Sequence, residues 1–183
     1  MPPERSSAGP PSPWDSFLDE VDTRLLTPVE LHCVGGFALT TVYGVPRTTG
    51  DLDFTSVVPA HAAGLLEEIA GPGSPVAEKH GLYLRRVGVD DLPEAYQERL
   101  REAFPARFRQ LRLFVLDPYD LVLSKLTRNS AKDREDVRFL ARSLALDSTV
   151  LRERYQKELR PYLANEDRHD LTLKLWLEDY FAR

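Results

Sequence analysis

The sequence predicts an α+β protein with strands in the first part of the chain and helices alone in the second part. Short apolar or alternating segments, which are typical of strands, fall between residues 30 and 116 and are separated by helical segments. After Asp117-Pro118 every remaining segment has the apolar spacing of a helix. We therefore expect a β-containing core at residues 14–117 and a helical region at residues 118–183 that packs on this core.

The composition is that of a globular protein that folds without covalent crosslinks. Of the 183 residues, 42% are hydrophobic and 29% are charged. Cys33 is the only cysteine, so no intrachain disulfide can form, and we expect a small core residue in a reducing cytoplasm. No apolar run reaches the roughly 18–20 residues that span a bilayer, so we expect no membrane partner. The net charge of −5 argues against broad, charge-driven binding of nucleic acid.

Residues 1–13 differ from the rest of the chain, because they are rich in Pro, Ser and Gly and lack the apolar stretch of a signal peptide. We expect them to form a disordered leader. Beyond them, helical spacing of apolar residues predicts helices in the first part of the chain at 14–26, 37–43, 60–70 and 92–104. Alternating or short apolar runs predict strands at 30–34, 51–58, 82–89 and 108–116.

The second part of the chain shows only helical periodicity. The expected helices are at residues 119–128, 133–144, 149–159 and 167–181. No internal repeat interrupts this series, which is typical of a C-terminal helical bundle.

A glycine pair, Gly35-Gly36, lies between an expected strand and the start of an expected helix. Glycines allow a sharp turn and let phosphate oxygens approach the backbone. Unpaired amides at a helix start also favour an anion. The pair alone is a weak signal, because most glycine pairs are ordinary turns.

An aspartate pair opens the following strand, where Asp51 and Asp53 alternate with Leu52 and Phe54. A strand therefore places both carboxylates on one face and both apolar side chains on the other. Their backbone positions lie about 6–7 Å apart, which allows both carboxylates to bind one Mg²⁺ or a pair of ions. Alone, the pattern also fits the exposed edge of a strand.

Taken together, these features resemble the active-site motif of nucleotidyltransferases, in which a glycine-rich helix start faces a strand with paired carboxylates. More closely, GGFALTTVYGVPRTTGDLDF resembles the AbiEii-like bacterial group, which includes abortive-infection and toxin–antitoxin nucleotidyltransferases. That group's signature continues from the glycine pair to Gly-x-Pro-Arg-x-Thr and Asp-x-Asp, and Arg47 with Thr48 or Thr49 matches it. The resemblance implies a nucleotidyltransferase-like mixed β-sheet flanked by helices, followed by a C-terminal helical bundle.

A second part of the resemblance lies in LDPYDLVLSKLTRNSAKDREDVRFLA, residues 116–141. In this group a helix carries an inward lysine, followed by an arginine and a Lys/Arg-Asp-x-x-Asp run. The matching residues are Lys125, Arg128, Lys132, Asp133 and Asp136. Helix capping and salt bridges are the alternative role of these charges.

The resemblance also implies roles for these residues. Asp51 and Asp53 would bind Mg²⁺ or Mn²⁺. A nucleoside triphosphate such as ATP or CTP would bind through a set that comprises Gly35, Gly36, Arg47, Thr48, Thr49, Lys125 and Arg128. Asp133 or Asp136 would orient the lysine or act on the acceptor. We expect Lys125 to converge with the two aspartates at the start of the glycine-pair helix.

One departure from the family pattern concerns the third carboxylate, which members of the superfamily place on a central strand. The expected strand at 108–116 has no acidic residue. Either Asp117 serves, or Asp133 or Asp136 substitutes for it, or the metal site has only two carboxylates.

Two functions therefore stay open. The first is a metal-dependent transfer of a nucleoside monophosphate to a hydroxyl of RNA such as tRNA, of a protein or of a small molecule, with a possible toxin role and a cognate antitoxin. The second is a catalytically inactive module that binds a nucleotide or a protein. The chain has neither a P-loop motif nor a strand followed by G-x-G-x-x-G, which argues against those two nucleotide-binding folds.

Overall fold

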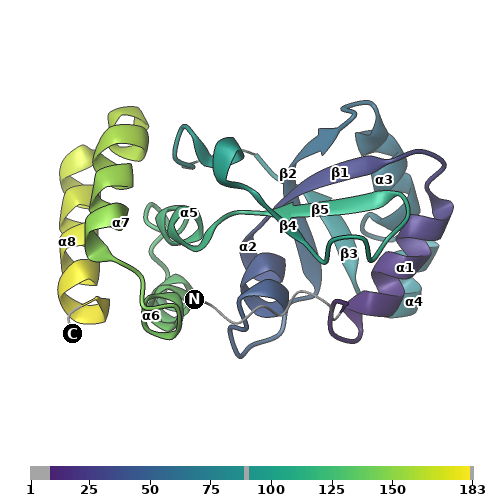
Figure 1. Ribbon diagram of the computed structural model, residues 1–183, viewed down its shortest axis with the longest axis horizontal. Helices are drawn as coiled ribbons and strands as arrows, with labels where there is room; N and C mark the ends of the chain where they lie inside the picture. The colour runs from purple at the N-terminus through teal and green to yellow at the C-terminus, as the bar shows by residue number, and fades with distance from the viewer. Residues whose placement is uncertain (1–8, 89–90, 182–183) are drawn as a thin grey trace. The chain divides into compact units, whose positions relative to one another are not determined.

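The computed structural model describes residues 9–88 and 91–181, so residues 1–8 of the expected leader lie outside the described part. The chain divides into two compact units. Residues 9–88 and 100–115 form one of them, here called the sheet unit, and residues 91–99 and 116–181 form the other, the helical unit (Figure 1). The expected α+β fold, with a mixed sheet flanked by helices and with C-terminal helices, is confirmed.

The sheet is mixed, with the strand order β3-β2-β1-β5-β4. β1 runs antiparallel to β2 and parallel to β5, β2 is parallel to β3, and β4 is antiparallel to β5. A register shift between His32 and Cys33 interrupts the pairing of β1 with β2. The strands are β1 Val29–Val34, β2 Asp51–Val58, β3 Tyr83–Arg86, β4 Arg101–Ala103 and β5 Leu111–Val115.

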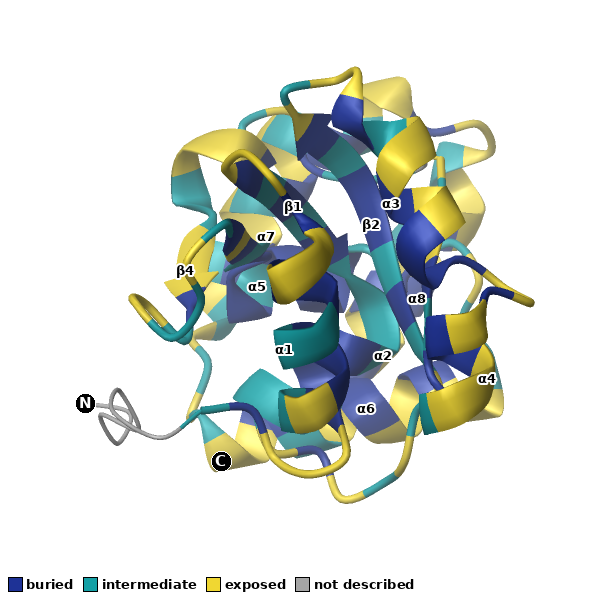
Figure 2. Cartoon of the chain, turned by 90° about the vertical axis from the view of Figure 1, so that its right-hand side faces the viewer, coloured by how far each residue is buried: buried dark blue, intermediate teal, exposed yellow. Residues whose placement is uncertain are grey.

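Alternation along the central strands produces one buried face and one half-exposed face. Leu31 and Cys33 on β1 and Leu52 and Phe54 on β2 are fully buried, whereas the alternate positions Glu30, His32, Asp51 and Asp53 are partly exposed. Figure 2 shows this alternation of dark blue and teal along β2. Cys33 is fully buried and is therefore a core residue, as expected, and this burial raises the pKa of its thiol.

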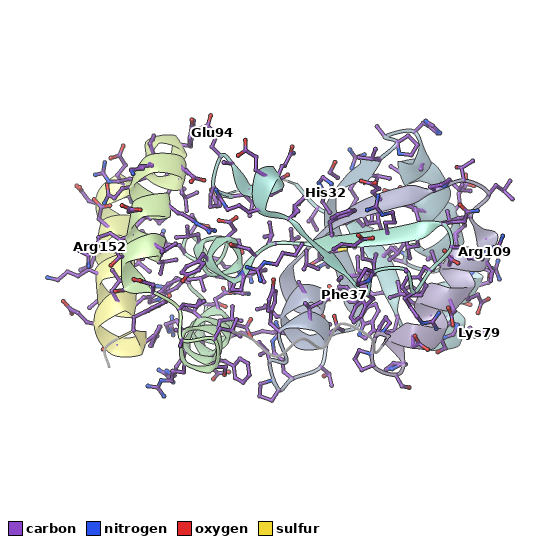
Figure 3. All side chains as sticks on the ribbon, viewed as in Figure 1. His32, Phe37, Lys79, Glu94, Arg109 and Arg152 are labelled. Atoms are coloured by element: carbon purple, nitrogen blue, oxygen red, sulfur yellow. The ribbon has the colours of Figure 1, made fainter. Side chains whose placement is uncertain are left out.

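The helices of the sheet unit bury apolar faces against the sheet and each other. Phe37, labelled in Figure 3, is fully buried, and its ring meets that of Trp14 edge-to-face with the centroids 4.9 Å apart. α3 contacts β2 and β3, and α1 contacts α3 and α4. These helices are α1 Trp14–Arg24, α2 Gly35–Phe37 with a π-helical continuation at Ala38–Val42, α3 Ala62–Ala70 and α4 Pro75–His80.

A buried aspartate connects α1 to the start of β5. The Asp22 carboxylate is 7% exposed and accepts hydrogen bonds from the backbone N–H groups of Arg109, Gln110 and Leu111 at 3.1, 2.7 and 2.8 Å. Hydrogen bonds to a charged acceptor are stronger than neutral ones, so this contact fixes where β5 begins.

The helix predicted at residues 92–104 is wrong. The structure has a short 3₁₀ helix at Tyr96–Arg99 and then β4, whose Glu102 lies opposite Phe114 of β5. The Glu102 carboxylate accepts hydrogen bonds from Arg112 at 3.0 and 3.2 Å. Pairing with the strand that follows next in the chain therefore overrides the local helical spacing.

The helical unit contains four α-helices, and most of their apolar side chains are buried, although Leu171 and Leu175 of the last helix are exposed. Side chains of Asp117, Ser130 and Asp147 cap the first three of them by accepting backbone N–H groups. In the described part of the chain, no helix combines the length and the apolar character that crossing a membrane requires. The helices are α5 Pro118–Leu123, α6 Ala131–Ser143, α7 Ser148–Arg154 with a π-helical continuation at Tyr155–Leu159, and α8 Glu166–Tyr180.

Candidate active site

The glycine pair lies directly beside the second aspartate. β1 ends at Val34, and Gly35 begins α2 with a φ of +67°, a left-handed conformation that favours glycine. A Cβ added at Gly35 would lie 3.3 Å from Asp53 Oδ2. The turn between β1 and α2 therefore places bare backbone next to the Asp53 carboxylate, with which Val34 is also in register.

The second glycine is packed against the segment that precedes β2. A Cβ at Gly36 would lie 2.6 Å from Thr49 Oγ1 and 3.5 Å from Arg47 Nη1. The Thr49 hydroxyl donates a hydrogen bond to Asp51 Oδ1 at 2.8 Å. The structure thus brings together Gly35, Gly36, Arg47, Thr49, Asp51 and Asp53, whereas the exposed Thr48 contributes its backbone carbonyl to Arg47 at 3.4 Å.

Both aspartates lie on the half-exposed face of β2, where their side chains are 23% and 18% exposed. A guanidinium group from β3 binds the two carboxylates at once. Arg85 Nη2 lies 2.7 Å from Asp51 Oδ2, and Arg85 donates to Asp53 from Nε at 2.8 Å and from Nη2 at 3.1 Å. Its hydrogen bonds to Asp53 raise the pKa of Arg85, so the guanidinium stays charged.

Sequence reasoning missed Arg85. The segment that forms β3 carries two consecutive arginines, and alternation along a strand places them on opposite faces. Parallel pairing sets Arg85 opposite Asp53 and Arg86 opposite Phe54. The register between β2 and β3 is a tertiary property, which explains why neither arginine could be assigned to the aspartates from the sequence.

A buried ion cluster in the helical unit contains the downstream residues. Lys125 is 4% exposed, and its Nζ lies 3.1 Å from Asp133 Oδ1 and 3.0 Å from Asp136 Oδ2. Asp133 also forms a capping box with Ser130 at the start of α6 and accepts a hydrogen bond from Arg128 Nε at 2.7 Å. Burial alone would raise the pKa of Asp133, but the hydrogen bonds from Arg128 and Ser130 hold it well below its usual range.

The remaining candidate for the third carboxylate, Asp117, belongs to a second ion cluster of the helical unit. It caps α5 by accepting the Asp120 N–H at 2.9 Å, and Arg154 Nη1 binds its two oxygens at 2.8 and 2.9 Å. Asp120 is fully buried and binds Arg99 at 2.9 Å and Arg154 at 3.0 Å. Asp117, like Asp133 and Asp136, therefore binds a basic side chain.

The sheet unit and the helical unit each gather part of the expected site. The sheet unit holds the glycine pair and the paired aspartates, and the helical unit holds Lys125 with Arg128, Asp133 and Asp136. The expected convergence of Lys125 with Asp53 stays a prediction. Lys132, at the start of α6, is exposed.

The chemistry of the aspartate pair fits a divalent cation. Carboxylate oxygens are the ligands that Mg²⁺ and Mn²⁺ prefer. The pair already binds one cationic group, the Arg85 guanidinium. Within residues 9–88 and 91–181, no group of three or more His, Cys, Asp or Glu side chains is arranged to hold a metal ion.

Comparison with known proteins identifies the family. Residues 14–182 match the model of the family described as nucleotidyltransferase of unknown function (DUF6036). No curated protein and no solved structure matches the chain. The resemblance of the motifs to nucleotidyltransferases is thereby confirmed, while membership of the AbiEii-like group stays a prediction. With its glycine pair, its paired aspartates and a match over nearly the whole length, the chain belongs to the DUF6036 family of nucleotidyltransferases.

Proposed function

We propose that the protein is a metal-dependent enzyme that transfers a nucleoside monophosphate from a nucleoside triphosphate to an acceptor hydroxyl and releases pyrophosphate. The observation that carries this proposal is the arrangement of the sheet unit. There, the bare backbone of Gly35 adjoins the Asp53 carboxylate, in a chain that belongs to a nucleotidyltransferase family. Phosphate oxygens and a divalent cation are the groups that such an arrangement accommodates together.

Asp51 and Asp53 would hold the divalent cation, Mg²⁺ or Mn²⁺. When bound, such an ion neutralises phosphate charge and activates the attacking oxygen. The hydrogen bond from Thr49 to Asp51 orients one carboxylate, and the strand fixes the other on the same face. Gly35 lacks a side chain and so presents bare backbone to phosphate oxygens beside Asp53, whereas the Thr49 hydroxyl fills the space beside Gly36 and Arg47 Nη1 lies next to this glycine.

In the helical unit, we assign Lys125 to the charge that develops on the phosphates. Its ion pairs with Asp133 and Asp136 support a positioning role for these two carboxylates, because they hold the ammonium group in one place. Arg128 would share the phosphate charge. Its side chain is 70% exposed although it contacts Asp133, so it has room to reach a ligand.

The acceptor and the biological role are extensions of the same proposal. From the resemblance to the AbiEii-like group, the acceptor is RNA such as tRNA, a protein side chain or a small molecule. The same resemblance suggests a toxin with a cognate antitoxin, and the single cysteine, Cys33, suggests a cytoplasmic location. The nucleotide would be ATP or CTP, or another nucleoside triphosphate.

A second candidate function is a module that binds nucleotide or protein without turnover. Two observations favour it: Arg85 neutralises both aspartates, and each candidate third carboxylate binds a basic side chain. Binding of a nucleoside triphosphate without release of pyrophosphate on any acceptor would support this function.

The experiment that separates the two functions is a labelling assay. The purified chain is incubated with each α-labelled nucleoside triphosphate, with Mg²⁺ or Mn²⁺, and with total RNA and lysate protein as acceptors. We expect label on one acceptor class. The labelling rate should fall by at least about 100-fold in Asp53→Asn, because this variant removes the charge of one of the two carboxylates that would hold the metal ion.

Asp179→Asn is the matched control, since Asp179 lies exposed on α8 in the helical unit. It should label at the rate of the unmodified chain. Labelling that persists in Asp53→Asn would contradict the assignment of the metal site, and absence of labelling with every nucleotide would favour the binding module.

A further inference from the structure

The contact between Arg85 and the two aspartates is the strongest feature that the proposed function leaves unexplained. The guanidinium reaches both members of the pair, with three nitrogen–oxygen distances between 2.7 and 3.1 Å. Carboxylates on one face of a strand repel each other unless a positive charge neutralises them. Arg85 supplies that charge from the neighbouring strand.

The backbone holds this arrangement in place. β2 and β3 are parallel, and Asp53 is in register with Arg85 while Asp51 is in register with Tyr83. The planar fork of the guanidinium matches two carboxylate oxygens at once, which a lysine cannot do. The Arg85 side chain is nevertheless 47% exposed, so it can leave the carboxylates without breaking a packed core.

Other arginines of the sheet unit bind pairs of acidic residues that have no place in the glycine–aspartate motif. Arg107 binds Asp15 and Asp19, and Arg112 binds Glu30 and Glu102. Arg85 differs because its partners are the two carboxylates to which the proposed function assigns the metal ion. The same Asp53 oxygens that would ligate the ion accept hydrogen bonds from the guanidinium.

From this geometry we infer that Arg85 is the resident cation of the aspartate pair, and that a divalent metal ion competes with it for the same oxygens. The inference rests on the proposed function, because it concerns the same two carboxylates. A displaced guanidinium stays next to the site on β3, where a nucleotide phosphate offers it a new partner. Metal ion and triphosphate therefore bind cooperatively. The metal ion frees the guanidinium to bind a phosphate, and the phosphate stabilises the displaced guanidinium and so lowers the free-energy cost of metal binding.

The test measures Mn²⁺ binding directly, by titration with electron paramagnetic resonance detection of the free ion. In the absence of nucleotide, Arg85→Gln removes the competing charge and should bind Mn²⁺ at least about tenfold more tightly than the unmodified chain. Arg85→Lys keeps the charge but not the fork and should fall between the two. Arg86→Gln is the matched control, because its position is in register with Phe54 on the other face, and its affinity should stay within about twofold of the unmodified chain.

A second titration includes a non-hydrolysable nucleoside triphosphate. The unmodified chain should then gain more in Mn²⁺ affinity than Arg85→Gln does, because only the former has a guanidinium to transfer to the phosphates. Equal Mn²⁺ affinity of the unmodified chain and Arg85→Gln without nucleotide would overturn the inference, and so would failure of a folded Arg85→Gln to bind Mn²⁺. Circular dichroism of each variant establishes that it is folded.

The failure of the inference and that of the proposed function are distinguishable. Asp53→Asn abolishes Mn²⁺ binding if the aspartates are the metal ligands, whatever Arg85 does. Binding that persists in Asp53→Asn contradicts the metal site itself. Binding that depends on Asp53 but not on Arg85 contradicts only the competition, and the labelling assay then still reports on nucleotidyl transfer.

Discussion

At the scale of single residues, the candidate site depends on side chains that are absent as much as on those that are present. Gly35 adopts a conformation with positive φ, and Gly36 leaves the space that the Thr49 hydroxyl fills. Thr49 in turn orients Asp51. Adding one methyl group at Gly36 would therefore displace Thr49 and, through it, the Asp51 carboxylate.

Gly36→Ala should lower the labelling rate by about 10–100-fold, because the added Cβ displaces Thr49 and with it the Asp51 carboxylate. The unfolding temperature should change much less, since the displaced hydroxyl is only partly buried. Gly64→Ala on α3 is the control: its Cβ would meet nothing within 4 Å, so the rate should be unchanged. Equal rates for the two alanine variants would contradict this role of Gly36.

The residue scale also limits what could be predicted. The spacing of Asp51 and Asp53 predicted their common face, because alternation along a strand is a local property. Arg85 could not be assigned to them, because strand register depends on tertiary pairing. The motif indicates where a cation binds, whereas the identity of the cation already bound there is visible only in the structure.

At the scale of elements, several ion pairs of the helical unit lie at helix ends. Asp133 is the clearest case, since it completes a capping box, forms an ion pair with the buried Lys125 and accepts a hydrogen bond from Arg128. Its carboxylate links the first turn of α6 to Lys125 and Arg128, which lie in the segment between α5 and α6. Losing this charge would leave Lys125 with fewer compensating partners in a buried environment.

Asp133→Asn should reduce the free energy of unfolding by about 3–5 kcal/mol, the range typical when one partner of a buried ion pair is removed. Asp147→Ala, which removes the cap of α7 at an exposed position, should cost about 1 kcal/mol. Urea unfolding followed by circular dichroism measures both. Similar losses in the two variants would show that Asp133 acts as a cap alone.

The elements themselves were predictable where their signals are local. The strand expected at 51–58 matches β2, and the helices expected at 133–144 and 167–181 match α6 and α8 within two residues. β4 was mistaken for part of a helix because its three residues gain their strand character from β5. α4 was overlooked, although Ser74 caps it, Pro75 begins it and Gly81 ends it in a left-handed conformation.

At the scale of the whole molecule, acidic side chains with lowered pKa values occur in both units. In the sheet unit, hydrogen bonds from Lys79, His80 and Arg24 lower the pKa of Glu20 to about 2; Lys79 is labelled in Figure 3. In the helical unit, hydrogen bonds from Arg160 and Tyr155 lower the pKa of Asp170. A group whose pKa is lower in the folded state stabilises the fold above its unfolded pKa.

This stabilisation should be lost as the pH falls from about 4.5, near the unfolded pKa of a glutamate, through about 2. We therefore expect an unfolding temperature that is nearly constant from pH 6 to 8 and that decreases steadily below about pH 4.5. Glu20→Gln should flatten this decrease, whereas Glu178→Gln, at an exposed position 4.0 Å from Lys174, should not. If the unfolding temperature of Glu20→Gln decreased with pH as steeply as that of the unmodified chain, Glu20 would not be a source of the acid-dependent loss of stability.

The path of the chain between the units has a consequence for how the protein can be divided. Residues 91–99 belong to the helical unit, yet residues 100–115 return to the sheet before the chain enters α5. Arg99, at the end of the first of these segments, binds Asp120 and Glu158 far along the chain. No single cut therefore yields both units whole. A fragment that ends at residue 115 would carry Arg99 without its partners Asp120 and Glu158, so truncation there would leave a partly buried ion cluster incomplete as well as removing the helices.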